Sequence, residues 1–159
     1  MKTIELEING IFHRVDIDER TLLIKLLRDQ LGLTGTHMGC DTTQCGCCTV
    51  HLNDKPVKSC TVLAVRANGA KVTTIEGVSK DKNLHPVQAE FNKCHALQCG
   101  FCTPGMVMSS IDIVKRLTTD DPHEIRSALE GNLCRCTGYE NIVKAIQHCI
   151  RDRLDNEKI

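Results

Sequence analysis

Apolar and polar residues alternate at the start of the chain, whereas apolar residues recur at helical spacing over its second half. Residues 3–8 place their apolar side chains on one face, and period two resumes at Val15 and Ile17. Between these segments stands Asn9-Gly10, a preferred type I′ turn. The pattern therefore predicts a β-hairpin at the beginning of the chain.

A helix is expected after this hairpin. Leucines and isoleucines recur at helical spacing from Leu22 to Leu31, with Thr21 as a suitable N-cap and Gly32 as a suitable end. The next segment, residues 34–48, is rich in glycine, threonine and cysteine and has no usable period. A loop of this length inside a compact domain usually has a function.

Short strands follow this loop. Residues 49–52 read as a strand, Asn53-Asp54 as a turn, and Val57 as the start of a partner strand. A short helix is expected over 60–65 and a last strand over 72–75. Strands, one helix and a cysteine-rich loop are typical of a β-grasp ferredoxin-like unit, which we expect to span residues 1–77.

The second half of the chain reads as helical. Four helices are expected, over residues 85–95, 103–117, 122–131 and 140–154. Thr103-Pro104 suits an N-cap followed by proline, and Asp121 with Glu124 suits a capping box. The predicted fold is therefore α+β: the ferredoxin-like domain, a polar linker over 79–83, and a four-helix bundle over residues 83–159.

Composition narrows the possible functions. The 20 basic and 20 acidic side chains cancel, which argues against nucleic acid as the main partner. Eleven cysteines are an unusual number for 159 residues. The first residues alternate in polarity, unlike an export signal, and no apolar run is long enough to span a membrane. We therefore expect a cytoplasmic protein whose cysteines bind metal rather than form disulfides.

The long loop contains the first candidate ligand set. Cys40, Cys45 and Cys48 have the spacing C-x4-C-x2-C, with Cys60 further on. This is the plant-type ferredoxin arrangement for a [2Fe–2S] cluster. Gly39 and Gly46 would allow backbone N–H groups to approach the sulfurs. A structural zinc site is the alternative, although zinc loops usually carry two separated C-x2-C pairs.

Cys47 has no place in this spacing, so we interpret it as a small side chain pointing into the β unit.

A second set consists of two cysteine pairs. Cys99 and Cys102 form C-x2-C, and Cys134 and Cys136 form C-x-C. Both pairs lie next to predicted helix ends. From spacing alone, zinc and an iron–sulfur cluster are equally compatible with this set.

The residues around the cysteines resemble one family over nearly the whole chain. The segments 98–106 (QCGFCTPGM) and 131–139 (GNLCRCTGY) are similar to motifs of the small iron–sulfur subunits of the molybdenum hydroxylases, the xanthine oxidase family. The first cysteine loop, over 39–50, is similar to them as well.

This resemblance implies two [2Fe–2S] clusters. One would be held by Cys40, Cys45, Cys48 and Cys60, and the other by Cys99, Cys102, Cys134 and Cys136. In the family, residues that match Gln98 and Cys136 approach a molybdopterin held by a separate large subunit. The resemblance implies the cytosine dinucleotide form of this cofactor. The first cluster would face FAD in a medium subunit, and the implied assembly is a dimer of heterotrimers.

The same resemblance implies an electron-transfer subunit rather than a complete enzyme. Segments such as 33–42 and 57–65 look most like the small subunits of aerobic carbon monoxide dehydrogenases and of aldehyde or glyceraldehyde oxidoreductases. Carbon monoxide or an aldehyde is therefore the expected substrate, although the large subunit selects it. The alternative is a free-standing ferredoxin or a zinc-stapled binding module, which would not co-purify with large and medium subunits.

The remaining histidines and cysteines are expected to be structural. None of the seven histidines is paired at a spacing suited to a metal, and His37 and His95 are expected on the surface or hydrogen-bonded near the cysteine loops. Cys94 and Cys149 occupy apolar helical positions, so we expect both to be small buried side chains.

Overall fold

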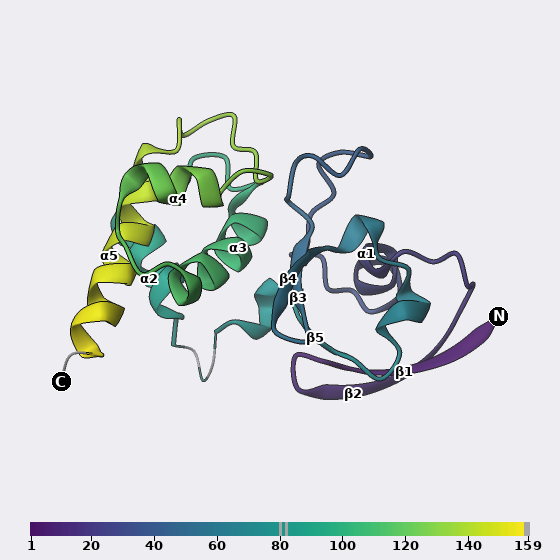
Figure 1. The fold of residues 1–159 in the computed structure, drawn as a ribbon. Helices are drawn as coiled ribbons and strands as arrows, with labels where there is room; N and C mark the ends of the chain where they lie inside the picture. Colours follow the sequence, from purple (N-terminus) through teal and green to yellow (C-terminus); the bar gives the residue numbers. More distant parts are fainter. Residues whose placement is uncertain (80, 82, 158–159) are drawn as a thin grey trace.

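A computed structural model describes residues 1–79, 81 and 83–157. Its first half is a five-stranded sheet in the order β2-β1-β5-β3-β4 (Figure 1). The strands are β1 (Lys2–Ile8), β2 (Ile11–Ile17), β3 (Thr49–Leu52), β4 (Lys55–Lys58) and β5 (Lys71–Thr73). β1 and β5 are parallel, whereas the other three pairings are antiparallel.

The predicted hairpin is confirmed. β1 pairs with β2 from Lys2↔Ile17 to Ile8↔Ile11. The connecting Asn9 and Gly10 have φ values of 52° and 83°, the positive values that a type I′ turn requires. The apolar face of β1 is fully buried in the core of the sheet part.

The helix predicted after the hairpin is shorter and irregular. It consists of α1 (Leu23–Lys25) and a π-helical turn η1 (Leu26–Gln30), and Gly32 follows with φ 69°. The Thr21 cap was wrong: the N-cap is Leu22, without a side-chain hydrogen bond. Thr21 instead accepts a backbone hydrogen bond from Ala64 through its carbonyl.

The prediction of a helix over residues 60–65 was also wrong. Two 3-10 turns, η2 (Ser59–Thr61) and η3 (Ala64–Ala67), stand there with extended residues between them. The reason is a tertiary contact, because Leu23 N–H donates to the Val62 carbonyl and Leu22 forms a β-bridge with Leu63. A further 3-10 turn, η4 (Ile75–Gly77), occupies the end of the strand predicted over 72–75.

Within residues 83–157, which the structure describes, four helices occur, as predicted. They are α2 (Pro86–Lys93), α3 (Thr103–Arg116), α4 (Pro122–Ala128) and α5 (Glu140–Asn156). Helix α3 begins at Thr103, and Cys102, which is already in the αR region, is the N-cap in place of the predicted Thr103. Helix α4 ends before the predicted Gly131, and the Asp121 cap accepts from His123 N–H at 2.8 Å. His85 and Gln88 form a capping box that the sequence analysis missed.

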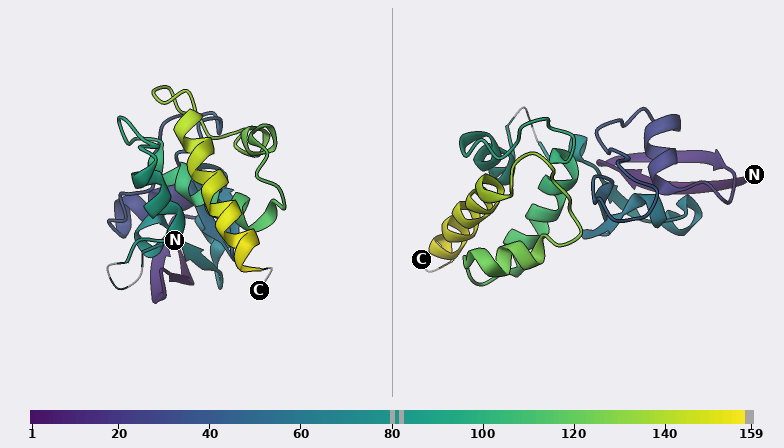
Figure 2. Two further views of the ribbon diagram at one scale, coloured as in Figure 1. Left: turned by 90° about the vertical axis from the view of Figure 1, so that its left-hand side faces the viewer. Right: turned by 90° about the horizontal axis from the view of Figure 1, so that it is seen from above.

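Helix α3 joins the two halves. It packs against β3 and β4 on one side and against α2 and α5 on the other, as the views in Figure 2 show. The buried His51 of β3 lies 2.8 Å from the Met108 carbonyl of α3 through Nε2. The mixed α+β class is thus confirmed, whereas the four-helix bundle stays a prediction, because α2 and α4 are only 8 and 7 residues long.

The two halves have separate apolar cores. The buried residues of the first core come from the sequence range Ile4 to Val72, and those of the second from the range Val78 to Ile150. The domain boundaries at 77 and 83 stay a prediction. Two residues of the predicted linker, Lys80 and Lys82, and the last two of the second domain, Lys158 and Ile159, lie outside the described residues. Among the residues the structure does describe, no helix has the length and apolar character needed to cross a bilayer.

Candidate metal centres

The first predicted ligand set converges around the loop that precedes β3. Cys45 N–H points at Cys40 Sγ across 3.4 Å. This amide, then the Cys45 thiol and the amides of Thr42 and Gln44, lower the pKa of the Cys40 thiol to about 6. Backbone dipoles in this loop therefore favour a thiolate at Cys40, which is the form that binds a metal.

Cys60 reaches the same loop from turn η2. The N–H and Oγ of Ser59 both donate to the Cys48 carbonyl, at 3.2 and 2.7 Å, and so hold the two segments together. Burial, and then the neighbouring thiols of Cys48, Cys40 and Cys45, raise the pKa of Cys60 to about 12. Four thiols this close repel one another as thiolates, and a cation bound among them would relieve that repulsion.

The second predicted set converges in the same way, at the start of α3 and in the loop between α4 and α5. Burial, and then Cys134, Cys47 and Cys99, raise the pKa of Cys102 to about 12. A hydrogen bond with Cys99 is the largest cause of the raised pKa of Cys136. The loop before α3 and the loop before α5 thus bring Cys99, Cys102, Cys134 and Cys136 together.

The loop between α4 and α5 is shaped by Tyr139, the only tyrosine of the chain. Its hydroxyl accepts from Cys134 N–H at 2.8 Å and donates to the Asn132 carbonyl at 3.0 Å. Thr137 Oγ1 lies 3.0 Å from Cys134 Sγ. Burial raises the pKa of Cys134. The Thr137 hydroxyl and the backbone amides of Thr137 and Cys136 outweigh this effect, so the pKa of Cys134 is lowered overall.

The two cysteine loops are in direct contact. Leu133 N–H donates to the Cys45 carbonyl at 2.8 Å, and the buried Asn132 amide donates to the Gly46 and Gly105 carbonyls at 3.2 and 3.4 Å. In Figure 1 both loops extend toward the upper edge of the molecule, beside α3. Asn132 stands two residues before Cys134, but no pattern in the sequence predicted its role in this contact.

Cys47 lies at this junction. It is buried, as predicted, and its backbone lies against the start of α3. A Cβ on Gly105 would stand 2.9 Å from Cys47 Cα, and the Cys47 thiol contributes to the raised pKa of Cys102. The Cys47 thiol itself faces Cys45 and Gly39 of its own loop, so the interpretation of Cys47 as a small side chain pointing into the β unit stays a prediction.

The second set also reaches the surface. Gln98, Cys99 and Cys136 are all exposed. Large apolar side chains beside them are exposed too, namely Leu97, Phe101 and Leu133. His37 lies here as expected, with Nδ1 2.7 Å from the Phe101 carbonyl and its ring stacked on that of Phe101.

Both sets fit a [2Fe–2S] cluster in their donor chemistry. Each set offers four thiols close enough to shift one another's pKa, and four is the number of ligands that such a cluster requires. The Cys45 amide and the Thr137 hydroxyl point at ligand sulfurs, as expected around an anionic cluster. Four thiolates also suit zinc, so donor chemistry alone leaves both metals possible.

Comparisons with known proteins decide the family. Residues 6–71 match a 2Fe-2S iron-sulfur cluster binding domain, and residues 74–147 match a [2Fe-2S] binding domain. The β subunit of the 6-hydroxypseudooxynicotine dehydrogenase complex of Paenarthrobacter nicotinovorans is 49% identical over 158 residues, covering 94% of this chain and 96% of that one. This chain belongs to the small iron–sulfur subunits of the molybdenum hydroxylase family.

Further relatives of this iron–sulfur subunit support the assignment. The aldehyde oxidoreductase iron-sulfur-binding subunit of Escherichia coli is 41% identical over 157 residues, covering 89% of this chain and 69% of that one. The crystal structure of quinoline 2-oxidoreductase from Pseudomonas putida 86 contains a chain with a TM-score of 0.91 and 38% identity, covering 99% of the subunit and 98% of that chain. The resemblance to carbon monoxide dehydrogenases stays a prediction.

The iron–sulfur subunit also contains a group of polar side chains that the sequence did not predict. Cys149 is buried as expected, but Cys94 is only half-buried and lies within reach of Glu90 and His148. The prediction that Cys94 is a small buried side chain holds only in part, because Cys94 packs against the helical core but stays half-buried. Glu90 and Cys94 stand four residues apart, a spacing that could have indicated a shared helix face, but His148 lies 54 residues further along.

Proposed function

We propose that this chain is the electron-transfer subunit of a molybdenum-containing dehydrogenase. It would hold one [2Fe–2S] cluster on Cys40, Cys45, Cys48 and Cys60 and another on Cys99, Cys102, Cys134 and Cys136. When bound, each such cluster accepts and releases one electron at a time. The observation that supports this most is the contact between the two cysteine loops, through Leu133 N–H and the Cys45 carbonyl.

The exposed end of the second set suits a partner that holds molybdopterin. Gln98 and Cys136 would face that cofactor in a large subunit, and the exposed Leu97, Phe101 and Leu133 would be covered by the same subunit. Burial of such apolar side chains is a main source of affinity in stable complexes. The first set would face FAD in a medium subunit, and two such heterotrimers would form the complete assembly.

The substrate is chosen outside this chain. Relatives are named for 6-hydroxypseudooxynicotine, caffeine and aldehydes, and the sequence predicts carbon monoxide or an aldehyde. We therefore widen the proposed substrates to aldehydes and nitrogen heterocycles and keep carbon monoxide among them. The cytoplasmic location stays a prediction from the cysteine chemistry.

Two cysteine variants test the ligand assignment. Cys136→Ser is expected to damage the second cluster, to slow turnover of the assembled complex and to keep the signal of the first. Cys60→Ser is the matched variant, expected to lose the first cluster and keep the second. Iron and acid-labile sulfide analysis with electron paramagnetic resonance after dithionite reduction measures both.

The wild-type protein supplies the decisive controls. About four irons and four sulfides per chain, with two overlapping signals, are expected from two clusters. Zinc without sulfide would overturn the proposal in favour of a zinc-stapled module. A chain that purifies alone from its native host, without large and medium subunits, would instead identify a free-standing ferredoxin.

A further inference from the structure

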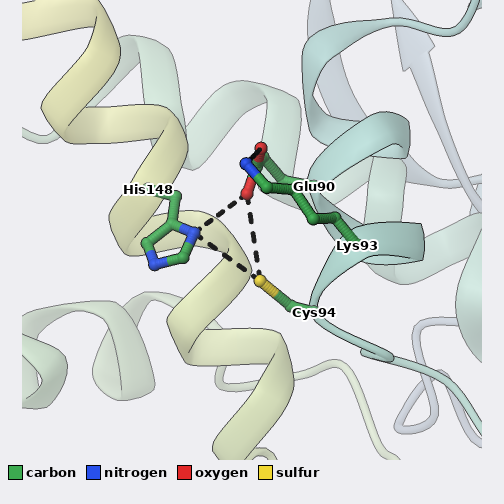
Figure 3. Close-up of polar contacts among 4 residues, drawn as sticks. All are labelled: Glu90, Lys93, Cys94 and His148. Atoms are coloured by element: carbon green, nitrogen blue, oxygen red, sulfur yellow. Dashed lines mark hydrogen bonds and ion pairs between the residues drawn. The ribbon is translucent and has the colours of Figure 1, made fainter.

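Three side chains that belong to neither cysteine set converge between α2 and α5. Glu90 is on α2, Cys94 ends that helix, and His148 is on α5. His148 Nδ1 lies 2.9 Å from Glu90 Oε2 and 3.6 Å from Cys94 Sγ, and Cys94 Sγ lies 3.9 Å from the same Glu90 oxygen (Figure 3). One carboxylate oxygen, one thiol and one imidazole nitrogen thus form a small triangle.

The distances match those around a tetrahedral cation. Zinc binds cysteine sulfur at about 2.3 Å and histidine nitrogen or carboxylate oxygen at about 2.0–2.2 Å, which places tetrahedral ligands about 3.3–3.6 Å apart. The three observed separations lie within roughly half an ångström of that range. A small shift of each side chain would therefore suffice to bind the ion.

The orientation of His148 argues against a catalytic relay. In a nucleophile–histidine–acid relay, the nucleophile and the acid contact different ring nitrogens. Here Nδ1 faces both Cys94 and Glu90, while the other ring nitrogen points away from them (Figure 3). When a sulfur and a carboxylate oxygen both face the same imidazole nitrogen, the three atoms are arranged like ligands around a shared ion.

Neighbouring groups orient the carboxylate and leave access for an ion. Lys93 Nζ lies 3.0 Å from Glu90 Oε1, so the second oxygen, Oε2, remains directed at the triangle. A hydrogen bond to the free oxygen of a ligand carboxylate is typical support around a metal. The His148 side chain is 33% exposed and that of Glu90 is 13% exposed, which leaves a side open for an ion and a water ligand.

We propose that Glu90, Cys94 and His148 form a zinc site that joins α2 to α5. A thiolate and an imidazole favour zinc over magnesium or calcium, and the carboxylate completes a three-ligand set with a position left for water. On binding, the Cys94 thiol and the Nδ1 of His148, which faces the Glu90 carboxylate, would each give up a proton to solvent, and the imidazole would carry its remaining proton on Nε2. This site is independent of the two cysteine sets assigned to iron.

Zinc loading of the cluster-containing protein tests the site. The protein is treated briefly with a chelator, checked for unchanged iron and sulfide, loaded with zinc chloride and passed through gel filtration. Wild type is expected to retain about one zinc per chain, and zinc-edge X-ray absorption to show about one sulfur among nitrogen and oxygen ligands. Cys94→Ser and His148→Gln are expected to weaken zinc binding at least about tenfold.

Two further variants complete the test. His123→Gln removes an exposed histidine of α4 and is expected to bind zinc like wild type. Glu90→Gln keeps the side-chain shape and removes a ligand charge, so it replaces either of the other variants if that variant fails to fold. Equal zinc retention by Cys94→Ser, His148→Gln and wild type would overturn the proposal. An absorption spectrum with four sulfur ligands would also overturn it, because zinc would then occupy an emptied cluster site.

A readout on wild-type protein removes the dependence on folding of variants. Zinc at ten times its dissociation constant is expected to slow alkylation of Cys94 by N-ethylmaleimide about tenfold, as measured by mass spectrometry. An alkylation rate unaffected by zinc would contradict the site directly.

Discussion

The backbone N–H of Leu133 donates to the carbonyl of Cys45 at 2.8 Å. Cys45 belongs to the first proposed ligand set, and Leu133 directly precedes Cys134 of the second. A main-chain hydrogen bond thus links the two proposed clusters through a few covalent bonds on either side. Asn132 and Gly105 pack around the same contact, so the distance between the clusters depends on how closely these loops approach.

Gly105→Ala is expected to destabilise the protein, although alanine normally stabilises a helix by about 1 kcal/mol relative to glycine. The new Cβ on α3 would lie 2.2 Å from the Gly46 carbonyl oxygen and 2.9 Å from Cys47 Cα, both of them backbone atoms. Overpacking of this kind costs about 1–3 kcal/mol. Thermal unfolding of the cluster-containing protein measures the change.

Ser127→Ala is the control for this variant, because Ser127 is exposed on α4 and reports only the helix propensity of alanine. It is expected to leave stability unchanged or slightly higher. Equal or greater stability of Gly105→Ala would mean that the two loops are not packed as closely as the structure indicates.

Tyr139→Phe tests the loop that carries Cys134. Loss of the hydroxyl leaves Cys134 N–H and the Asn132 carbonyl without their partner, at a cost of about 1–3 kcal/mol. We expect faster release of iron from the second set to a chelator, while the first set is unaffected. Release is followed by absorbance, and electron paramagnetic resonance identifies which signal declines.

Thr61→Val is a matched removal of a hydroxyl, since Thr61 Oγ1 donates to the Lys58 carbonyl at an exposed position beside Cys60. It is expected to release iron at the wild-type rate. The role assigned to Tyr139 would be wrong if its variant lost iron equally from both sets.

Much of the fold could be predicted from local patterns. Asn9-Gly10 specifies its turn through backbone conformation alone, and the apolar stripe of α5 gives that helix to within a few residues. The errors occurred where a distant contact overrides the local preference. Residues 60–65 form two turns instead of a helix because Val62 is held extended by Leu23, which is far away in the sequence.

The candidate sites show the same limit. Cysteine spacing marks both iron–sulfur sets because their ligands stand close together in short motifs. The partners of Cys94 could not be predicted, because His148 comes from another helix and its position depends on how α2 packs against α5. The contact of Cys47 with α3 likewise arises only from the tertiary fold.

Cys47→Ala is expected to keep both clusters. Burial, and then the nearby Cys45 thiol, raise the pKa of Cys47 to about 12, so it remains a protonated thiol at neutral pH. The variant should retain about four irons per chain, whereas Cys48→Ala should lose about half of them. Iron analysis of the two purified variants compares them directly, and equal losses would make Cys47 a ligand.

Two capping contacts at the start of α4 can be distinguished by mutation. Asp121 accepts a hydrogen bond from His123 N–H at 2.8 Å, whereas the sequence also predicted a reciprocal contact through Glu124. Asp121→Ala is therefore expected to cost about 1 kcal/mol, within the usual range for loss of an N-cap. Glu124→Ala is expected to change stability by less than about 0.5 kcal/mol, because Glu124 is exposed. Denaturant unfolding of both variants checks this, and equal costs would show that the capping box forms in solution.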